Sequence, residues 1–440
     1  MCKSKEKNKE VFMRRFILII LTGVLFCQGL SGAEWKAGFS QWRMEQALDA
    51  LEEFAGEIED IREINGNMYY AALCKRINSY GREIIPLMLR DLEDKGKDWK
   101  YRYMLMDRLL FVKGRKSEDQ SLFCNTLTKI LQDKDEPLNL RINSIDALSR
   151  LAGTSSLMDK AKRAEVARKL IAIASDKTEP TQIRWEIIND LDRFAKRFGD
   201  VLFEPLLSFC EDTDTHIRAI SISTLVVLAR FIQNDSLETV IKSFLVEKLR
   251  DEEDRLVKEQ ITYGIKTLKV RESIPLLLES LKSGIYCNKV EAAELLGLMK
   301  VQEAVPELIS ILKDGERDAL LVSKVCIALG RIGDRSAIEP MREVLKGSRY
   351  GAYHGAAIGL AMLGAREATE DIEEKFLSLD GFDETLAMAL LVLGGKGKVE
   401  VVKRKAGRNL RSLGGIKEVI KTVEEGKGID IQLIERFVRR

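Results

Sequence analysis

The chain of 440 residues has few of the residue types that build catalytic and metal sites, with two histidines and seven cysteines, and it has no Cys-x-x-Cys pair. An enzyme usually shows convergent acid–base groups, a nucleophile beside a base, or a metal box. Structural zinc sites use closely spaced Cys and His. Neither pattern is present. The sequence therefore predicts no catalytic residue, no cofactor and no metal, and it predicts that the chain is not an enzyme.

Proline is also scarce, with seven residues, whereas 45% of the residues are hydrophobic and 32% are charged. The ordinary hydrophobic fraction excludes a disordered chain. The charged fraction exceeds the roughly 25% that is typical of globular proteins, which indicates a large solvated surface. Together these values favour many short amphipathic helices, as in a helical solenoid.

A strong net charge is lacking as well, since the total is +2, but the distribution is uneven. Residues 396–440 carry +7 and residues 1–33 carry +4, which leaves −9 for residues 34–395. Binding of nucleic acid along the body would need a basic stripe, so no nucleic-acid partner is expected. A basic cluster near the C-terminus could contact anionic lipid or an acidic partner, although a solvated helix face is the preferred reading. Its members are Lys403, Arg404, Lys405, Arg408 and Arg411.

The longest hydrophobic run, Phe16–Leu30, has about 15 residues, short of the roughly 20 that a membrane-spanning helix needs. Basic residues precede it and Ser31-Gly32-Ala33 follows, which is the order of a secretory signal peptide. We therefore predict cleavage near Ala33 and an exported chain, periplasmic or extracellular; the alternative is a membrane anchor formed by the uncleaved signal. Either Met1 or Met13 could be the true start. Cleavage would leave five cysteines, of which Cys326 is predicted to be a core residue and Cys287, in a predicted loop, the better candidate for a reactive thiol.

An internal repeat is the clearest signal in the chain. Apolar stripes of helical spacing begin at residues 274, 305, 338 and 372, in steps of 31, 33 and 34. Proline near the start of these stripes suits a first helical turn, which does not use its N–H group. Leu-Gly pairs advance in step and predict the end of the preceding helix, with glycine at the left-handed C′ position. These pairs are Leu296-Gly297, Leu329-Gly330 and Leu363-Gly364.

The segments Ala304–Gly315 and Val325–Asp334 resemble the HEAT repeat, in the short HEAT-like form related to phycobilisome lyase repeats. The resemblance implies an all-α, right-handed α-α superhelix of the armadillo type, in which the second helices line the concave surface. The deoxyhypusine hydroxylase branch of HEAT-like proteins uses His-Glu pairs for iron. Neither His216 nor His354 precedes a glutamate, so that activity is excluded. His216 is predicted to lie in a solvated, helix-capping loop, and His354 on a surface or in a groove.

The predicted domains are the signal peptide 1–33, a helical cap 34–66, a HEAT-like array 67–395 that is clearest over 267–379, and a basic helical cap 396–440. A glycine-rich linker, 394–398, is expected before the second cap. Upstream the repeats are longer, and Glu136-Pro137 and Glu179-Pro180 open helices 43 residues apart. Arginines follow at matching positions and are predicted to pair with acidic residues of the adjacent repeat: Arg141, Arg184 and Arg218. The acidic run 251–254 is interpreted as a solvated connection.

These features predict an exported, non-enzymatic scaffold that binds a protein or peptide partner on the concave face of the solenoid. The alternatives are a lyase-like or enzyme-accessory protein and a membrane-anchored adaptor. Mixed charge on the second helices suits a polar protein partner. The candidate binding residues are Glu279, Lys282, Glu307, Lys313, Glu339, Arg342 and Glu343.

Overall fold

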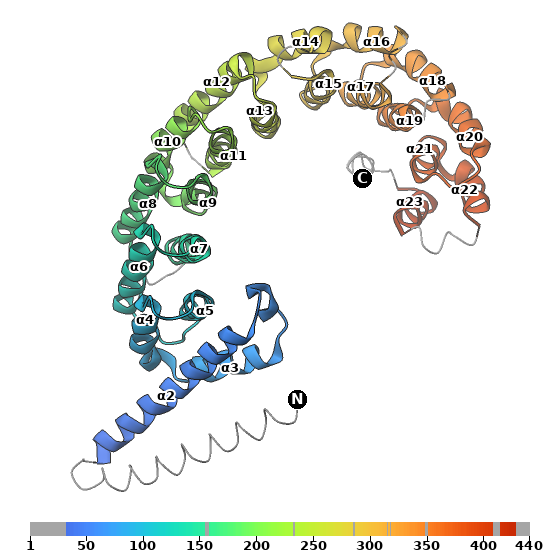
Figure 1. Ribbon diagram of the computed structural model, residues 1–440. Coiled ribbons are helices and arrows are strands. Elements are labelled where there is room, and N and C mark those ends of the chain that lie inside the picture. The colour runs from blue at the N-terminus through green and yellow to red at the C-terminus, as the bar shows by residue number, and fades with distance from the viewer. Residues whose placement is uncertain are drawn as a thin grey trace. The chain divides into compact units, whose positions relative to one another are not determined.

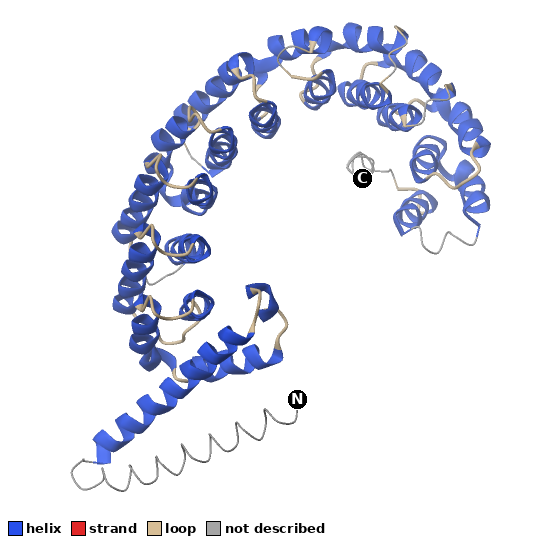
Figure 2. Ribbon diagram, viewed as in Figure 1, coloured by secondary structure: helices blue, strands red, loops and turns tan. Residues whose placement is uncertain are grey.

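The structure of the chain is a computed structural model that describes residues 32–154, 158–231, 234–284, 287–314, 316, 318–347, 351–407 and 414–427. Within these ranges every regular element is a helix, which confirms the predicted all-α fold (Figure 2). The chain divides into two compact units, Met1–Leu202 (unit 1) and Phe203–Arg440 (unit 2), and each is described by itself. The predicted hydrophobic signal segment and the last part of the predicted basic cap, residues 428–440, lie outside the described residues.

The described part of unit 1 begins with the long helix α2 (Gly32–Glu57), which buries Leu48 and Leu51 of the predicted cap 34–66. Shorter helices then stack in pairs along the chain (Figure 1). They are α3 (Met68–Ser79), α4 (Ile85–Glu93), α5 (Trp99–Leu109), α6 (Ser117–Gln132), α7 (Leu138–Thr154), α8 (Lys160–Ser175) and α9 (Thr181–Asp190), followed by α10 (Ala195–Phe209), in which the boundary between the units falls.

From α13 to α22, unit 2 repeats one arrangement, a helix, a short 3₁₀ turn and a second helix. Its helices are α11 (Thr215–Phe231), α12 (Asp235–Asp251), α13 (Arg255–Leu268), α14 (Ile274–Ser283), α15 (Lys289–Leu298), α16 (Val305–Lys313), α17 (Ala319–Ile332), α18 (Ile338–Lys346), α19 (Ala352–Leu363), α20 (Thr369–Ser378), α21 (Glu384–Gly394), α22 (Val399–Ala406) and α23 (Gly414–Glu424). Residues 395–398 form such a turn between α21 and α22, so the expected glycine linker is part of a repeat and the pattern extends past residue 395.

The predicted second helices of the repeats are confirmed. Helices α14 and α16 each carry proline in the first turn, as the missing N–H group allows. Their apolar stripes and those of α18 and α20 face the core. The buried members are Leu277, Leu281, Val305, Leu308, Ile338, Met341, Leu345, Ile372 and Phe376.

The Leu-Gly pairs have two different roles, and the prediction was right for only one of the three glycines. Gly364 follows α19 with a left-handed φ of 62°, as expected for a C-terminal glycine. Gly297 and Gly330 lie inside α15 and α17 instead. A Cβ atom on Gly330 would stand 2.7 Å from the Cα atom of Gly359, so these glycines allow neighbouring helices to touch backbone to backbone.

Unit 2 has two rows of helices that curve together (Figure 1). The outer row contains α12, α14, α16, α18 and α20, and the inner row contains α13, α15, α17, α19 and α21. The inner helices approach more closely because of the glycine contacts, which explains the direction of the curve. The proline-initiated second helices are therefore in the outer row, and the expectation that they line the concave side is wrong.

Buried arginines join successive repeats in unit 1. Arg141 of α7 donates a hydrogen bond to Glu179 over 2.6 Å, which confirms its predicted role. Arg102 of α5 does the same with Glu136 through two bonds of 2.7 Å, and the sequence did not identify it. Each arginine also donates from Nε to a backbone carbonyl of the preceding helix. The Glu-Pro motifs therefore provide both a helix start and the acid that binds the previous repeat.

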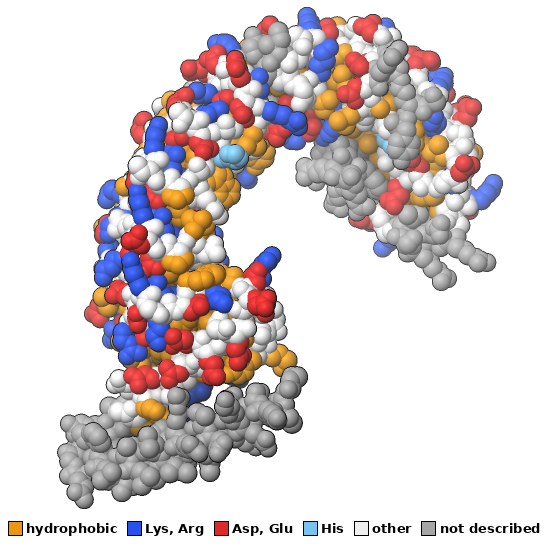
Figure 3. All heavy atoms as spheres, in the orientation of Figure 1, with side chains coloured by type: hydrophobic (Ala, Val, Ile, Leu, Met, Phe, Trp, Pro, Cys, Tyr) orange, Lys and Arg blue, Asp and Glu red, His pale blue; other side chains and the backbone are white. Residues whose placement is uncertain are grey.

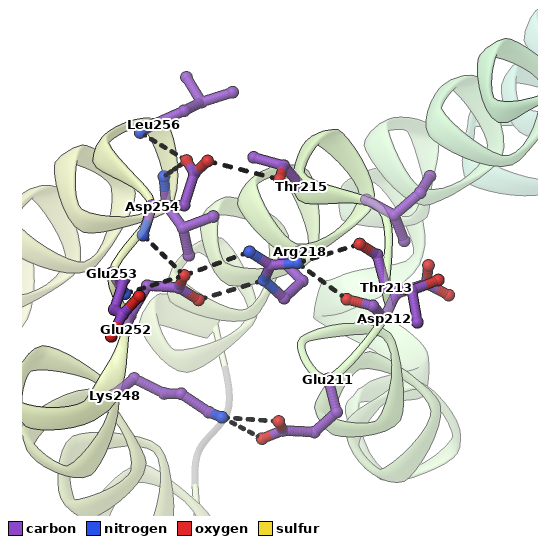
Figure 4. A network of polar contacts seen from close by, with 12 residues as sticks. Glu211, Asp212, Thr213, Thr215, Arg218, Lys248, Glu252, Glu253, Asp254 and Leu256 are labelled. Carbon is purple, nitrogen blue, oxygen red and sulfur yellow. Dashed lines mark hydrogen bonds and ion pairs between the residues drawn. The ribbon is translucent and has the colours of Figure 1, made fainter.

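Unit 2 contains a related network around Arg218 of α11 (Figure 4). The Arg218 guanidinium donates two 3.1 Å hydrogen bonds to Glu252, confirming the predicted pairing, and bonds of 3.0 and 3.3 Å to the carbonyls of Asp212 and Thr213. Asp254 caps the N-terminus of α13, accepting from the backbone N–H of Leu256 over 2.8 Å. The acidic run is thus only partly a solvated connection, because two of its four side chains hold helices together.

Candidate partner-binding surface

The seven residues predicted from the sequence to bind a partner lie on α14, α16 and α18, in the outer row of unit 2. Glu279, Lys282 and Lys313 are exposed, and Glu307 is half-buried. The side chains of these four residues make no ion pair with another described residue. As a binding surface these positions stay a prediction, on the convex side of the unit.

The predicted site on α18 is mainly a contact between repeats. Arg342 donates to Asp371 of α20 and, over 2.6 Å, to Glu339 of its own helix. These two carboxylates raise the pKa of the Arg342 guanidinium above its ordinary value. Because Arg342 already joins α18 to α20, it is less available to a partner than the exposed Glu343 beside it.

The inner row carries a ladder of ion pairs that the sequence did not reveal. Glu294 of α15 accepts from Lys266 of α13 over 2.6 Å and from Lys324 of α17 over 3.2 Å. Burial raises the pKa of Glu294, but the two lysines outweigh it and hold the pKa below its ordinary value. Three consecutive inner helices are joined through this carboxylate.

Large apolar side chains are exposed on the same inner helices. Tyr263 of α13 is 46% exposed and Leu320 of α17 is 57% exposed. Figure 3 shows hydrophobic side chains lying between charged ones over this part of unit 2. The inner row therefore combines charged and apolar groups on helices that are held side by side.

His354 of α19 contacts α21, the next helix of the inner row. Its Nε2 atom lies 2.6 Å from the carboxylate of Asp383, which caps the N-terminus of α21. Burial raises the pKa of Asp383, but the hydrogen bonds from His354 and the backbone outweigh it and keep the pKa below its ordinary value. The expectation that His354 lies on a surface or in a groove omitted this partner, which is 29 residues away and reached only by stacking.

The remaining predicted sites are mostly structural. Lys405 donates to the carbonyls of Leu377 and Leu379 over 3.1 and 2.6 Å, and so caps the end of α20. Lys403 pairs with Glu424 of α23 over 2.7 Å. Arg408 and Arg411 of the basic cluster lie outside the described residues, and Arg404 is exposed.

The two singled-out cysteines are both buried. Cys326 belongs to the core, as predicted. Cys287 lies between α14 and α15, as the predicted loop required, but it does not suit a reactive thiol, because it is only 4% exposed and burial raises its pKa to about 11. A protonated thiol is a poor nucleophile.

His216 is solvated and adjoins a helix cap, as predicted, but it belongs to the first turn of α11 and not to a loop. It stands at the start of α11, 71% exposed, with its backbone N–H bonded to Asp214 over 2.8 Å. Among the described residues no group of three or more His, Cys, Asp or Glu side chains could hold a metal ion. Within the same ranges no helix is long and apolar enough to span a membrane.

Residues 286–361, which include α15, α17 and most of α19, match the family model of HEAT repeats. The chain is a HEAT-like α-solenoid, as its sequence pattern indicated. Over 91 residues it is 37% identical to the bilin biosynthesis protein PecE of a Nostoc species. This alignment covers 21% of the chain and 36% of the relative, so the chain spans about a third of the length of the curated protein that it matches.

Solved structures of similar fold cover more of the chain. A structure of Kap95p with RanGDP aligns with a TM-score of 0.54 and 10% identity, over 86% of this chain and 61% of that one. A structure of importin beta aligns with a TM-score of 0.51 and 13% identity, over 87% and 57%. At these identities the likeness concerns the fold alone.

The similarity to PecE corrects the prediction that the chain is not an enzyme. A protein of bilin biosynthesis shares 37% of its residues over the aligned segment, so repeats of this kind occur in an enzymatic pathway. The absence of His-Glu pairs argues against one iron chemistry. The absence of these pairs does not exclude other enzyme activities, or a role as an accessory protein of an enzyme.

Proposed function

We propose that unit 2 binds a protein partner along its inner row of helices. The observation that carries this proposal is the continuity of that row. Backbone contacts at Gly297, Gly330 and Gly359 hold α15, α17 and α19 together, and the Lys266–Glu294–Lys324 ladder joins α13 to them. A partner would therefore meet a preformed surface, which avoids the entropy cost of ordering it on binding.

The composition of this surface suits a protein. Interfaces combine a central apolar contact, often aromatic, with a polar and charged rim. Tyr263 and Leu320 supply the exposed apolar groups and the lysine–glutamate ladder supplies the charged ones. Solenoids of the same fold include Kap95p, whose structure is of a complex with the protein RanGDP. The predicted outer residues, such as Lys282, would then be outside the interface.

Site-specific photo-crosslinking would test this proposal. Benzoylphenylalanine would replace Tyr263 on the inner row or, as a matched control, the exposed Lys282 on the outer row, in cells of the organism that encodes the chain. We expect the inner position to crosslink one protein and the outer position to give no comparable product. The crosslinked protein, once purified, should bind the chain in a defined ratio.

Two substitutions would then measure the interface. Truncation of a buried aromatic side chain at an interface commonly weakens binding by about tenfold or more. Tyr263→Ala should therefore raise the Kd by at least about tenfold, whereas Lys282→Ala should leave it unchanged. Crosslinks from the outer row alone, or equal effects of the two substitutions, would contradict the proposal.

The match to PecE favours a second candidate function, an accessory role in the chemistry of a small molecule such as a bilin. Absorption spectroscopy separates the two candidates. If the second is right, a purified linear tetrapyrrole titrated with the chain will bind in a one-to-one ratio and its visible band will shift. If only the protein-binding function is right, the spectrum will stay that of the free pigment.

We also propose that the chain is exported, with the signal cleaved near Ala33. Cleavage there would remove the first two residues of α2, which begins at Gly32, and leave the buried residues Leu48 and Leu51 in place. Sequencing the mature N-terminus should find Glu34 first, in a periplasmic or extracellular fraction. A chain that keeps residues 1–33 and sediments with membranes would instead support the anchored form.

A further inference from the structure

Unit 1 contains a pocket of about 860 Å³ that none of the functions above uses. It lies along α3 and reaches the end of α5 and the turn after it. Left-handed glycines stand at both ends of α3, Gly66 with a φ of 77° and Gly81 with a φ of 58°, where the chain turns into and out of the helix. The volume is in the range of small-molecule sites, roughly 300–1,000 Å³.

The charge around this pocket is positive. Three cationic side chains, Lys75, Arg108 and Lys113, line it together with neutral residues, and no lining residue is acidic. Arg108 is held by Asp107, with a bond of 3.1 Å from Nε. Lys75 and Lys113 are exposed and make no ion pair with any residue that the structure describes. Two ammonium groups are therefore available to a ligand.

Two polar atoms of lining residues are buried behind the wall of the pocket. The hydroxyl of Tyr70 is buried beside the Cys74 thiol, with the charges of Arg108 and Asp107 nearby. The side-chain carbonyl oxygen of Asn78 is also buried and accepts no hydrogen bond from a described residue. Burial raises the pKa of Tyr70 well above its ordinary value, so its hydroxyl stays protonated and adds no negative charge to the pocket.

Apolar groups also line the pocket, and they come from Ile64, Met68, Ala71 and Cys74. Tyr70 stacks on Phe54 of α2, with their ring centres 5.8 Å apart. The guanidinium carbon of Arg108 lies 5.6 Å from the ring centre of Tyr70 and 5.1 Å from that of Phe111. Met68, at the rim, is 87% exposed, an unusual position for a large apolar side chain. An apolar surface is thus present next to the two free lysines.

We propose that this pocket binds a small organic anion, a carboxylate with an apolar body. The anionic group lies between Lys75 and Lys113, and the apolar body lies against Met68, Ala71 and Cys74. The lysines would bind the anionic group and the apolar lining would bind the apolar body. Such a molecule should therefore bind more tightly than a simple ion or a neutral hydrocarbon, each of which uses only one of these contacts.

Two fluorescent probes that share an apolar body test this proposal on the full chain. 8-Anilinonaphthalene-1-sulfonate carries an anionic group that stands in for the carboxylate, and N-phenyl-1-naphthylamine is neutral. We expect the anionic probe to bind saturably at one site, about tenfold more tightly than the neutral one. Lys75→Gln combined with Lys113→Gln should weaken the anionic probe by about tenfold, the combined effect of two exposed ion pairs, and leave the neutral probe unchanged.

Two further variants separate the pocket from general surface binding. Ala71→Glu adds a negative charge to the exposed lining and should weaken the anionic probe several-fold, with an unchanged circular dichroism spectrum. Lys160→Gln, at an exposed lysine of α8 outside the pocket, should have no effect. Equal binding of the two probes, an unchanged affinity in the double lysine variant, or an equal loss in Lys160→Gln would each overturn the proposal.

Discussion

The buried pair between Arg102 and Glu136 offers the sharpest test of how the repeats of unit 1 are held together. Their side chains are 3% and 4% exposed and share two hydrogen bonds of 2.7 Å. Nε of Arg102 also donates to the carbonyl of Leu92 over 2.8 Å. Glu136→Gln keeps the shape of the side chain but removes its charge, so a guanidinium is left buried without an anion.

Leaving one charge of a buried pair uncompensated destabilises a protein by about 3–5 kcal/mol. Glu136→Gln should therefore lower the free energy of opening this part of unit 1 by about that amount. Arg102→Met should do the same, because it leaves the Glu136 carboxylate buried and unpaired. The double variant Arg102→Met/Glu136→Leu carries neither charge. Its remaining loss is the unpaired carbonyl of Leu92, about 1–3 kcal/mol, so it should be more stable than either single variant.

Hydrogen exchange followed by mass spectrometry is the suitable assay, because repeat proteins can open locally and a single unfolding free energy is then poorly defined. In Glu136→Gln, amides of α5 and α7 should exchange about 100- to 4,000-fold faster, the equivalent of about 3–5 kcal/mol, whereas α2 should change less. Unchanged exchange in the single variants would refute the reasoning. So would a double variant whose loss equals the sum of the two single losses.

Three further predictions concern unit 2. Gly359→Ala would place a Cβ atom 2.3 Å from a backbone carbonyl oxygen of α17. Calorimetry should therefore show a lower Tm and a loss of stability of about 1–3 kcal/mol. The control Gly397→Ala, with no atom within 4 Å of the new Cβ, should melt like the parent. The pKa of Asp383 lies below its ordinary 3.8, so its contact with His354 stabilises fully above that pH and is lost as the pH falls through the lower folded value. Exchange of α21 should accelerate there, and His354→Gln should move the onset to higher pH; an onset that stays in place would contradict this. Lys405→Met removes hydrogen bonds to the end of α20 and should cost about 1 kcal/mol, and unchanged exchange of α20 in this variant would argue against the cap.

Much of the fold could be predicted because its signals are local. The apolar spacing from Ile274 to Leu281 defines a helix and its buried face without reference to any other helix. Proline at 275 and 306 marks a helix start for a reason contained in its own ring. Arg141 was also within reach, because its position after a Glu-Pro motif repeats along the chain.

The candidate surface was less predictable, because it depends on which row of helices is the inner one. Because glycine lacks a Cβ atom, it suits a left-handed turn, as at Gly364, and equally a close contact between helices, as at Gly330. The sequence cannot distinguish the two uses. Without that distinction the curvature is unknown, and the seven predicted residues were assigned to the concave side when they belong to the convex one.

By itself the sequence determined the repeating helices, their order and their buried faces, since each follows from the side chains within one or two turns. Only the tertiary structure decided which side of unit 2 is concave, that Glu294 joins three helices, and that His354 meets Asp383. These contacts link residues about 30 positions apart, brought together by stacking of whole repeats. Which residues meet depends on the distance between neighbouring helices. The glycines set this distance, and no local sequence pattern encodes it.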